Sequence, residues 1–173
     1  MHRLNHRCIE KFLFLTLCFG IQHLANAQDP PPLRTYRKTE ITALAGASYP
    51  IAGFGGLGVV IGKETTLGGR YGYRQLKGIS ASVEAGPGGL TSRLGWTSLY
   101  RYDAGAEGFS FDAVYMRTWN LKWGVERNRN WLGPGISYRI GYAKISGAAL
   151  VKTGPGSWRL APSASVGIVI PLK

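Results

Sequence analysis

Residues 90–102, LTSRLGWTSLYRY, alternate between two kinds of side chain at every second position. Because successive side chains of an extended strand point to opposite faces, this period of two predicts a β-strand. One predicted face carries two serines together with Leu90, Leu94, Trp96, Tyr100 and Tyr102. The other carries Thr91, Arg93, Gly95, Thr97 and Arg101, with Leu99 as its one large apolar residue. The strand therefore separates an apolar environment from one that accepts small and basic side chains.

The same alternation predicts seven more strands along the chain, at 41–49, 57–63, 70–74, 79–86, 109–119, 135–144 and 158–172. Segments with turn chemistry, many of them rich in glycine and proline, fall between them at 49–53, 63–66, 75–78, 86–89, 103–108, 126–130 and 153–156. No segment shows the period of a helix. We therefore expect an all-β fold, an antiparallel up-and-down β-barrel of about eight strands.

The composition is that of a folded chain with many tight turns. Of the 173 residues, 45% are hydrophobic and 17% are charged, which excludes a disordered polyampholyte. The 25 glycines have no three-residue period, which excludes a collagen and favours turns and close contacts in β structure. The formal net charge of +12 indicates an anionic partner without identifying it.

The first 27 residues have the three parts of a secretory signal peptide. Basic residues lie within 1–11, an apolar run covers 12–21, and the sequence Ala-Asn-Ala at 25–27 permits cleavage before Gln28. The apolar run is shorter than the roughly 20 residues of a membrane-spanning helix, which argues against an anchor. We expect a signal peptide over 1–27, a Pro-rich leader over 28–38 and a barrel domain over 39–173.

Cleavage at this position removes every cysteine and histidine from the chain. These residues are Cys8, Cys18, His2, His6 and His23. The remaining chain has no residues for a disulfide, a cysteine–histidine zinc site or a Ser–His catalytic triad. We therefore expect no enzyme activity, no metal and no cofactor.

The polar face of the predicted strands consists mainly of Gly, Ser, Thr and Ala, with isolated charges. A face in contact with water is usually dense in Lys, Glu and Asp, whereas small residues suit a narrow barrel lumen in which opposite charges pair. We expect a lumen charge network formed by Glu84, Arg93, Asp112, Arg139 and Arg159. In an alternative hypothesis, Glu84 and Asp112 are catalytic carboxylates, although neither has a second acidic residue near it in the sequence.

Aromatic residues with polar groups gather on the apolar face, many of them near strand ends. The set comprises Tyr71, Tyr73, Trp96, Tyr100, Tyr102, Tyr115, Trp119, Tyr138, Tyr142 and Trp158. An aromatic belt at the membrane–water interfaces explains this placement, whereas a soluble core favours Leu, Ile, Val and Phe. Two alternatives stay open: aromatic pairing within a soluble sheet, and a soluble periplasmic or secreted barrel whose aromatic face turns inward around an apolar ligand.

A basic segment lies between two predicted strands, where Lys122, Arg127 and Arg129 alternate with Trp123 and Trp131. Such a segment could contact nucleic acid through phosphate pairing and base stacking. Outside the cytoplasm, lipopolysaccharide phosphates or anionic lipid headgroups are the expected partners of the same three cations. A solvated turn is the third interpretation.

In these features the chain resembles the small eight-stranded outer-membrane β-barrel proteins of the porin-like superfamily. The resemblance covers 39–173 and rests on the signal peptide, on alternating repeats at 80–86 and 163–170, and on the aromatic strand ends. The last residues, IPLK at 170–173, differ from the aromatic final residue that is common in such barrels.

The resemblance implies a transmembrane barrel in the outer membrane of a Gram-negative cell envelope. It implies a structural or surface-interaction role, or a narrow conductance, without enzyme activity. The implied partners are outer-membrane lipid, lipopolysaccharide and the outer-membrane assembly machinery, with no nucleic acid.

Overall fold

A computed structural model describes residues 34–67, 73–102, 105–119, 128–154 and 159–172. The expected signal peptide, most of the expected leader and the residues Tyr71, Lys122, Arg127 and Trp158 lie outside this described part. Within it, no helix is long and apolar enough to cross a membrane.

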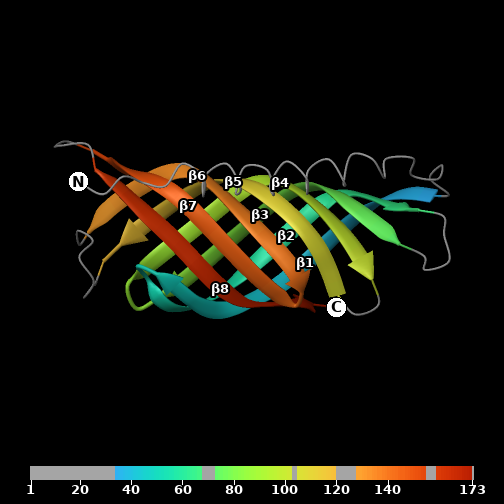
Figure 1. Cartoon of the computed structure of the whole chain (residues 1–173), viewed down its shortest axis with the longest axis horizontal. Helices are drawn as coiled ribbons and strands as arrows, with labels where there is room; N and C mark the ends of the chain where they lie inside the picture. The colour runs from blue at the N-terminus through green and yellow to red at the C-terminus, as the bar shows by residue number, and fades with distance from the viewer. Residues whose placement is uncertain (1–33, 68–72, 103–104, 120–127, 155–158, 173) are drawn as a thin grey trace, which may run out of the picture.

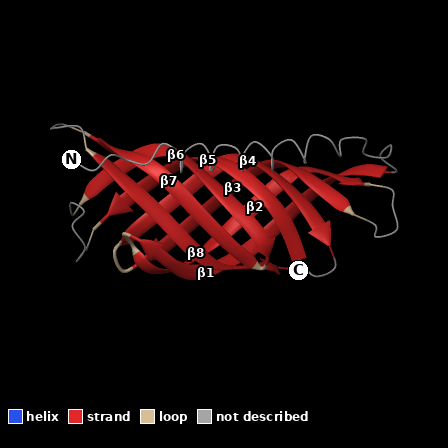
Figure 2. Ribbon diagram, in the orientation of Figure 1, coloured by secondary structure: helices blue, strands red, loops and turns tan. Residues whose placement is uncertain are grey.

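The described residues form eight β-strands (Figure 1). They are β1 (Arg34–Tyr49), β2 (Ala52–Thr66), β3 (Arg74–Gly86), β4 (Gly89–Tyr102), β5 (Gly105–Thr118), β6 (Arg129–Gly141), β7 (Ala143–Thr153) and β8 (Leu160–Leu172). Each strand pairs antiparallel with the next, and β8 pairs with β1, so the sheet closes into a barrel with no free edge (Figure 2). The expected all-β, antiparallel, up-and-down architecture of eight strands is confirmed.

The strands tilt strongly against the barrel axis, as Figure 1 shows. Following the paired residues once around the barrel from Thr35 on β1 leads back to β1 at Ala45, a stagger of ten residues. With the usual spacings within and between strands, eight strands and this stagger give a tilt of about 40°. A barrel of this size has an interior that its own side chains can fill.

The two faces predicted from the sequence point in opposite directions. On β4, Leu94 and Trp96 are 59% and 47% exposed, whereas Arg93 and Thr97 are 4% and 1% exposed. The same alternation continues around the barrel, with apolar side chains on the outer surface and small or polar side chains inside. Leu99, the exception on the polar face, is buried inside the barrel against Leu76 and Ala106.

Glycines on the inner wall allow neighbouring strands to approach closely. Gly62 and Gly78 are register partners on β2 and β3. A Cβ atom on Gly78 would lie 2.2 Å from the backbone oxygen of Ile61 and 2.5 Å from the Cα of Gly62. A side chain does not fit there, because both contacts are with backbone that cannot rotate away.

The first strand begins earlier than the sequence pattern indicated. Residues 34–38, expected to belong to the leader, form the start of β1. The Tyr36 hydroxyl donates a hydrogen bond to Glu64 on β2, so this polar segment is held by a partner that lies far away in the sequence.

Two predicted turns near β3 were wrong, and the strand expected at 70–74 lies largely outside the described residues, which resume at Tyr73 with β3 beginning at Arg74. The turn expected at 75–78 lies inside β3. The turn expected at 63–66 is the end of β2. Both segments contain a buried inward residue, Glu64 or Leu76, which breaks the simple contrast between faces.

The strand β7 was not predicted. The expected strand at 135–144 crosses the tight turn between β6 and β7, where Gly141 has a φ of 59° that favours glycine. Residues 144–149 of β7, KISGAA, are mostly small or polar, so this part of the strand shows no clear apolar face.

Gly78→Ala is expected to lower the free energy of unfolding by about 1–3 kcal/mol, because the new methyl group overpacks the wall between β2 and β3. Gly55→Ala is the matched control, since a Cβ atom at Gly55 has no atom within 4 Å. Urea unfolding followed by tryptophan fluorescence measures both. Equal unfolding midpoints for the two variants would contradict the close approach of the strands.

Candidate functional site

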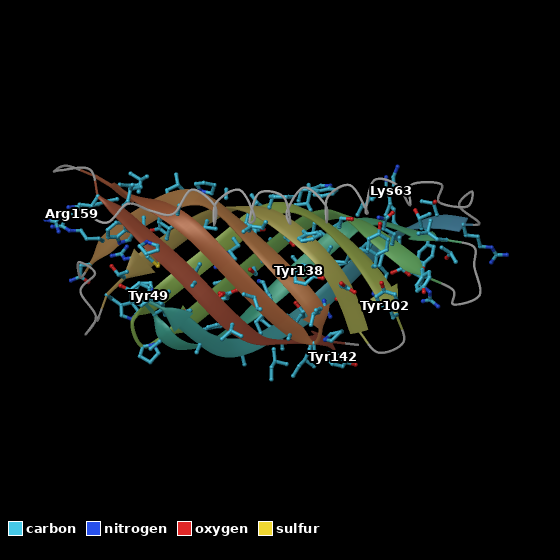
Figure 3. The ribbon with its side chains drawn as sticks, in the orientation of Figure 1. Tyr49, Lys63, Tyr102, Tyr138, Tyr142 and Arg159 are labelled. Atoms are coloured by element: carbon cyan, nitrogen blue, oxygen red, sulfur yellow. The ribbon has the colours of Figure 1, made fainter. Side chains whose placement is uncertain are left out.

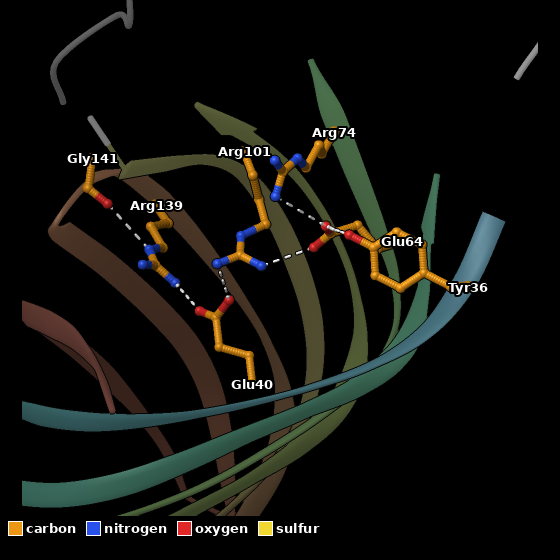
Figure 4. Close-up of polar contacts among 7 residues, drawn as sticks. All are labelled: Tyr36, Glu40, Glu64, Arg74, Arg101, Arg139 and Gly141. Atoms are coloured by element: carbon orange, nitrogen blue, oxygen red, sulfur yellow. Dashed lines mark hydrogen bonds and ion pairs between the residues drawn. The ribbon is translucent and has the colours of Figure 1, made fainter. Parts of the chain in front are cut away.

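Charged side chains fill the interior at the end of the barrel where β1 begins and β8 ends, here called the terminal end. Glu40 lies between two guanidinium groups: its Oε1 is 3.0 Å from Arg139 Nη1 and its Oε2 is 3.1 Å from Arg101 Nη2 (Figure 4). Arg101 Nη1 in turn donates to Glu64 Oε2 at 2.8 Å. These four residues form what we call the end network.

Two further residues support Glu64, which is completely buried. Tyr36 donates its hydroxyl proton to Glu64 Oε1, and Arg74 Nη1 lies 3.8 Å from the same oxygen (Figure 4). Arg139 is held by a second contact, because its Nε donates to the backbone oxygen of Gly141. The end network therefore pairs two carboxylates with two guanidinium groups, which offsets the desolvation of all four charges.

A second group of charges lies deeper inside the barrel. Lys144 Nζ is 3.3 Å from Glu84 Oε1, and Arg93 Nε is 3.8 Å from the same oxygen. The Ser137 hydroxyl donates to Asp112 Oδ2 at 3.2 Å. Glu84, Arg93, Asp112 and Lys144 form the central cluster, which also has equal numbers of positive and negative groups.

A cavity of about 70 Å³ lies between the end network and the central cluster. Its walls include Arg93, Asp112, Arg139 and Lys144, together with small hydroxyl residues and aliphatic side chains such as Leu99. Arg93 Nε and Nη1 make no hydrogen bond with the described residues. A polar space of this size holds several water molecules, which can satisfy such groups.

The other end of the interior, which we call the far end, is apolar. The buried residues there are Ile51, Val114, Met116, Trp131, Leu150 and Ala161. Val114 and Met116 lie on the inward face of β5, where they interrupt its polar pattern. The described part of the interior thus contains the end network with the small apolar group of Leu76, Leu99 and Ala106, then the central cluster, and this apolar cluster at the far end.

Four of the five expected lumen charges point inward. Glu84, Arg93, Asp112 and Arg139 are all buried. Arg159 is exposed, because it precedes the first residue of β8 at the far end (Figure 3). That expectation was wrong for this residue, which lies beyond the region that the barrel wall encloses.

The predicted charge network lacked four residues of the observed one: Glu40, Glu64, Arg101 and Lys144. Arg101 was on the polar face of the strand at 90–102, so its inward direction followed from the alternation. The two glutamates were obscured by wrong boundaries, because Glu40 was near the expected start of the domain and Glu64 in an expected turn. Lys144 was placed at the end of a strand that crosses a turn.

The proposed catalytic carboxylates are both engaged in the interior. Glu84 pairs with Lys144 and Arg93, and Asp112 accepts the hydrogen bond of Ser137. In the described ranges, no group of three His, Cys, Asp or Glu side chains could hold a metal ion. The contacts are those of a structural ion pair at Glu84 and of a structural hydrogen bond at Asp112.

Most of the described aromatic set lies on the outer surface. Tyr73, Tyr100 and Tyr102 are exposed near the terminal end, and the rings of Tyr73 and Tyr102 pack edge to face at 5.3 Å. Trp119 is exposed at the far end, where its Nε1 donates to the Pro87 oxygen at 3.1 Å. These residues lie at the two ends of the barrel.

The remaining described members of the set differ in position along the strands. Tyr142 is exposed at the β6–β7 turn, and Tyr115 and Tyr138 are partly buried. Trp96 departs from the expected belt, because its register partners are Ile79 and Phe111 in the middle of β3 and β5. It lies in the centre of the outer apolar surface.

Of the three cations expected to contact anions, Arg129 alone lies among the described residues. Arg129 is the first residue of β6 and pairs with Thr118 on β5, whose Oγ1 accepts a hydrogen bond from the Arg129 backbone N–H at 3.4 Å. Its backbone is therefore part of the barrel wall.

Taken together, these features define an eight-stranded antiparallel barrel with an apolar outer surface and a charged interior. Comparison of the chain with models of protein families, with curated proteins and with solved structures finds no match. Conclusions about function therefore rest on the geometry of the barrel.

Arg101→Met is expected to lower the free energy of unfolding by about 3–5 kcal/mol, because it removes the guanidinium group that Glu40 and Glu64 share and leaves the end network with two carboxylates and one guanidinium group. Arg117→Met removes an exposed arginine from the outer face of β5 and is the matched control. Urea titrations of the two variants measure the difference. Similar losses of stability in both variants would argue that Arg101 in the end network contributes no more to stability than an exposed arginine does.

Proposed function

We propose that this chain is a bacterial outer-membrane protein whose eight strands span the bilayer, with a structural or surface-interaction role and no enzyme activity. The observation that carries the proposal is the outward direction of the large apolar side chains. A barrel in water has the opposite arrangement, with its apolar side chains inside and charged ones outside. An outer surface of this kind is favourable in contact with lipid.

The length of the apolar surface fits a bilayer. On β8 the outward residues from Leu160 to Leu172 include no charged side chain. At a tilt of about 40°, each strand residue rises about 2.5 Å along the barrel axis. The β8 surface is therefore about 30 Å tall, close to the thickness of a hydrocarbon core.

Polar groups border the apolar surface at both ends. Arg37, Lys63 and Lys77 are exposed on the terminal side, and Arg117 is exposed on the far side. The exposed tyrosines and Trp119 lie at the same two borders. Aromatic and cationic side chains are favoured at the interfaces between hydrocarbon and water.

Both termini of the barrel lie at one end, because the number of strands is even. We place this terminal end on the periplasmic side, since outer-membrane barrels have short turns there and longer loops outside. The turn between β6 and β7 at this end is among the tightest in the fold. At the far end, the connection from β5 to β6 runs from 119 to 128.

The interior favours a structural or surface role over solute transport. The end network and the central cluster leave a cavity of about 70 Å³ between them, too small for a solute pore. The soluble alternative, a barrel that binds an apolar ligand, requires the aromatic face to turn inward. Trp96 and Ile140 point outward, and the cavity, which is lined by aliphatic as well as charged and hydroxyl side chains, has a volume of about 70 Å³, small for an apolar ligand.

The first test of the proposal is the location and heat-sensitivity of the protein. Expressed in a Gram-negative host, it is expected in the outer-membrane fraction, with different gel mobilities before and after boiling, because a closed barrel resists detergent until it is heated. Recovery in the soluble periplasmic fraction, with no heat shift, would favour the ligand-binding alternative.

The second test places a charge on the outer surface. Val166→Arg is expected to lower stability by about 2–4 kcal/mol in lipid, because Val166 is the central residue of β8. Ile140→Arg is expected to cost less, because Ile140 lies one residue from the end of β6. Leu160→Arg is the matched control, at the end of β8, with an expected loss of about 0–1 kcal/mol. Urea unfolding in phospholipid vesicles measures these losses. Equal tolerance of the three arginines would contradict a bilayer around the barrel.

A further inference from the structure

Three cations form a continuous row across neighbouring strands on the outer surface. Arg37 on β1 is the register partner of Lys63 on β2, and Lys63 is also the partner of Lys77 on β3. All three are exposed. Figure 3 shows Lys63 near the terminal end with its side chain directed away from the barrel. We call these residues the basic row.

The basic row has no acidic partner among the described residues. The ion pairs among the described residues involve cations other than these three. The outward carboxylate of Glu107, on β5, accepts a hydrogen bond from the Tyr138 hydroxyl on β6. Directly opposed side chains in an antiparallel sheet have Cβ atoms about 5 Å apart, and like charges at that distance repel each other. Such an arrangement is stabilised by an anion bound between the cations.

The basic row also lies at the border of the apolar surface. The next outward residue on β2 is Ile61 and on β3 is Ile79, which are 60% and 62% exposed. On β1 the next apolar outward residue is Ile41. Positive charge and exposed aliphatic surface thus meet in one strip that crosses three strands.

We propose that the basic row binds the phosphate groups of anionic phospholipids, whose acyl chains lie along the aliphatic strip. This inference rests on the proposed function, because it needs the terminal end to lie at a membrane surface. A lipid fits better than free phosphate, since the aliphatic side chains begin one outward position from the lysines. Ser98, the register partner of Lys77 on β4, adds a hydroxyl donor beside the row.

The test is lipid retention by the purified, full barrel. Protein is washed in detergent with an equal mixture of phosphatidylglycerol and phosphatidylcholine, and retained lipids are counted by native mass spectrometry. The wild type is expected to prefer phosphatidylglycerol, and Lys63→Gln to reduce that preference about fivefold, as expected for one cation at an anionic surface. The triple variant with Arg37→Gln, Lys63→Gln and Lys77→Gln is expected to lose it.

Arg117→Gln is the matched control, because Arg117 is an exposed outward cation at the far end. It is expected to keep the preference, and an equal loss in this control would overturn the assignment to the basic row. An unchanged preference in Lys63→Gln and the triple variant would overturn it as well. Displacement of the lipid by millimolar inorganic phosphate would overturn the choice of a lipid over free phosphate.

Failure of this inference is distinguishable from failure of the proposed function. A heat-shifted gel band in phosphatidylcholine vesicles reports a folded, inserted barrel whatever its lipid preference. Insertion without any preference for phosphatidylglycerol would overturn the basic row alone. Lack of insertion by the wild type in every vesicle would overturn the proposed function and the basic row with it.

Discussion

Closure of the eight-stranded ladder with a stagger of ten residues is the constraint on which the rest of the structure depends. It satisfies the backbone hydrogen bonds of every strand, and it also fixes how little space is left inside. Glycines such as Gly78 let neighbouring strands of the wall approach each other closely. Each larger side chain inside the barrel must therefore fit a space that the neighbouring side chains leave unfilled.

Within this narrow space the interior is layered along the axis. Ion pairs around Glu40 occupy the terminal end, a cavity lined by hydroxyl, charged and aliphatic side chains lies in the middle, and apolar side chains around Met116 fill the far end. Charges removed from water are stable there because each group lies close to an opposite charge or a hydrogen-bond donor. The interior is thus neutral while the chain as a whole carries +12, and the excess positive charge lies outside the described interior pairs.

Much of the architecture could be predicted from the sequence, because the period of two is a local property of the chain. The inner and outer faces of β4 followed from residues 90–102 alone, and so did the inward direction of Arg93 and Arg101. Boundaries were less predictable. Where inward residues are large, as at Leu76, or outward residues are small, as in β7, the two faces look alike and the alternation loses its contrast.

The partners within the charge network could not be predicted in the same way. Arg139 donates to Glu40 across 99 positions of sequence, and Arg101 donates to Glu64 across 37. Such pairs depend on the stagger of the barrel, which sets the height of each residue along the axis. The stagger is known once all eight registers are fixed, and a single strand contains no information about it.

The long sequence separation within the end network has a consequence for the order of folding. The first two strands carry both glutamates, and Tyr36 on β1 donates a hydrogen bond to Glu64 on β2. The arginine partners of Glu40 and Glu64 belong to β4 and β6. An isolated N-terminal hairpin therefore holds two carboxylates that still need water. The arginines that neutralise these carboxylates belong to later strands. The network therefore stabilises the closed barrel and contributes little to the stability of a partial sheet. The barrel is thereby expected to assemble as one cooperative unit rather than hairpin by hairpin.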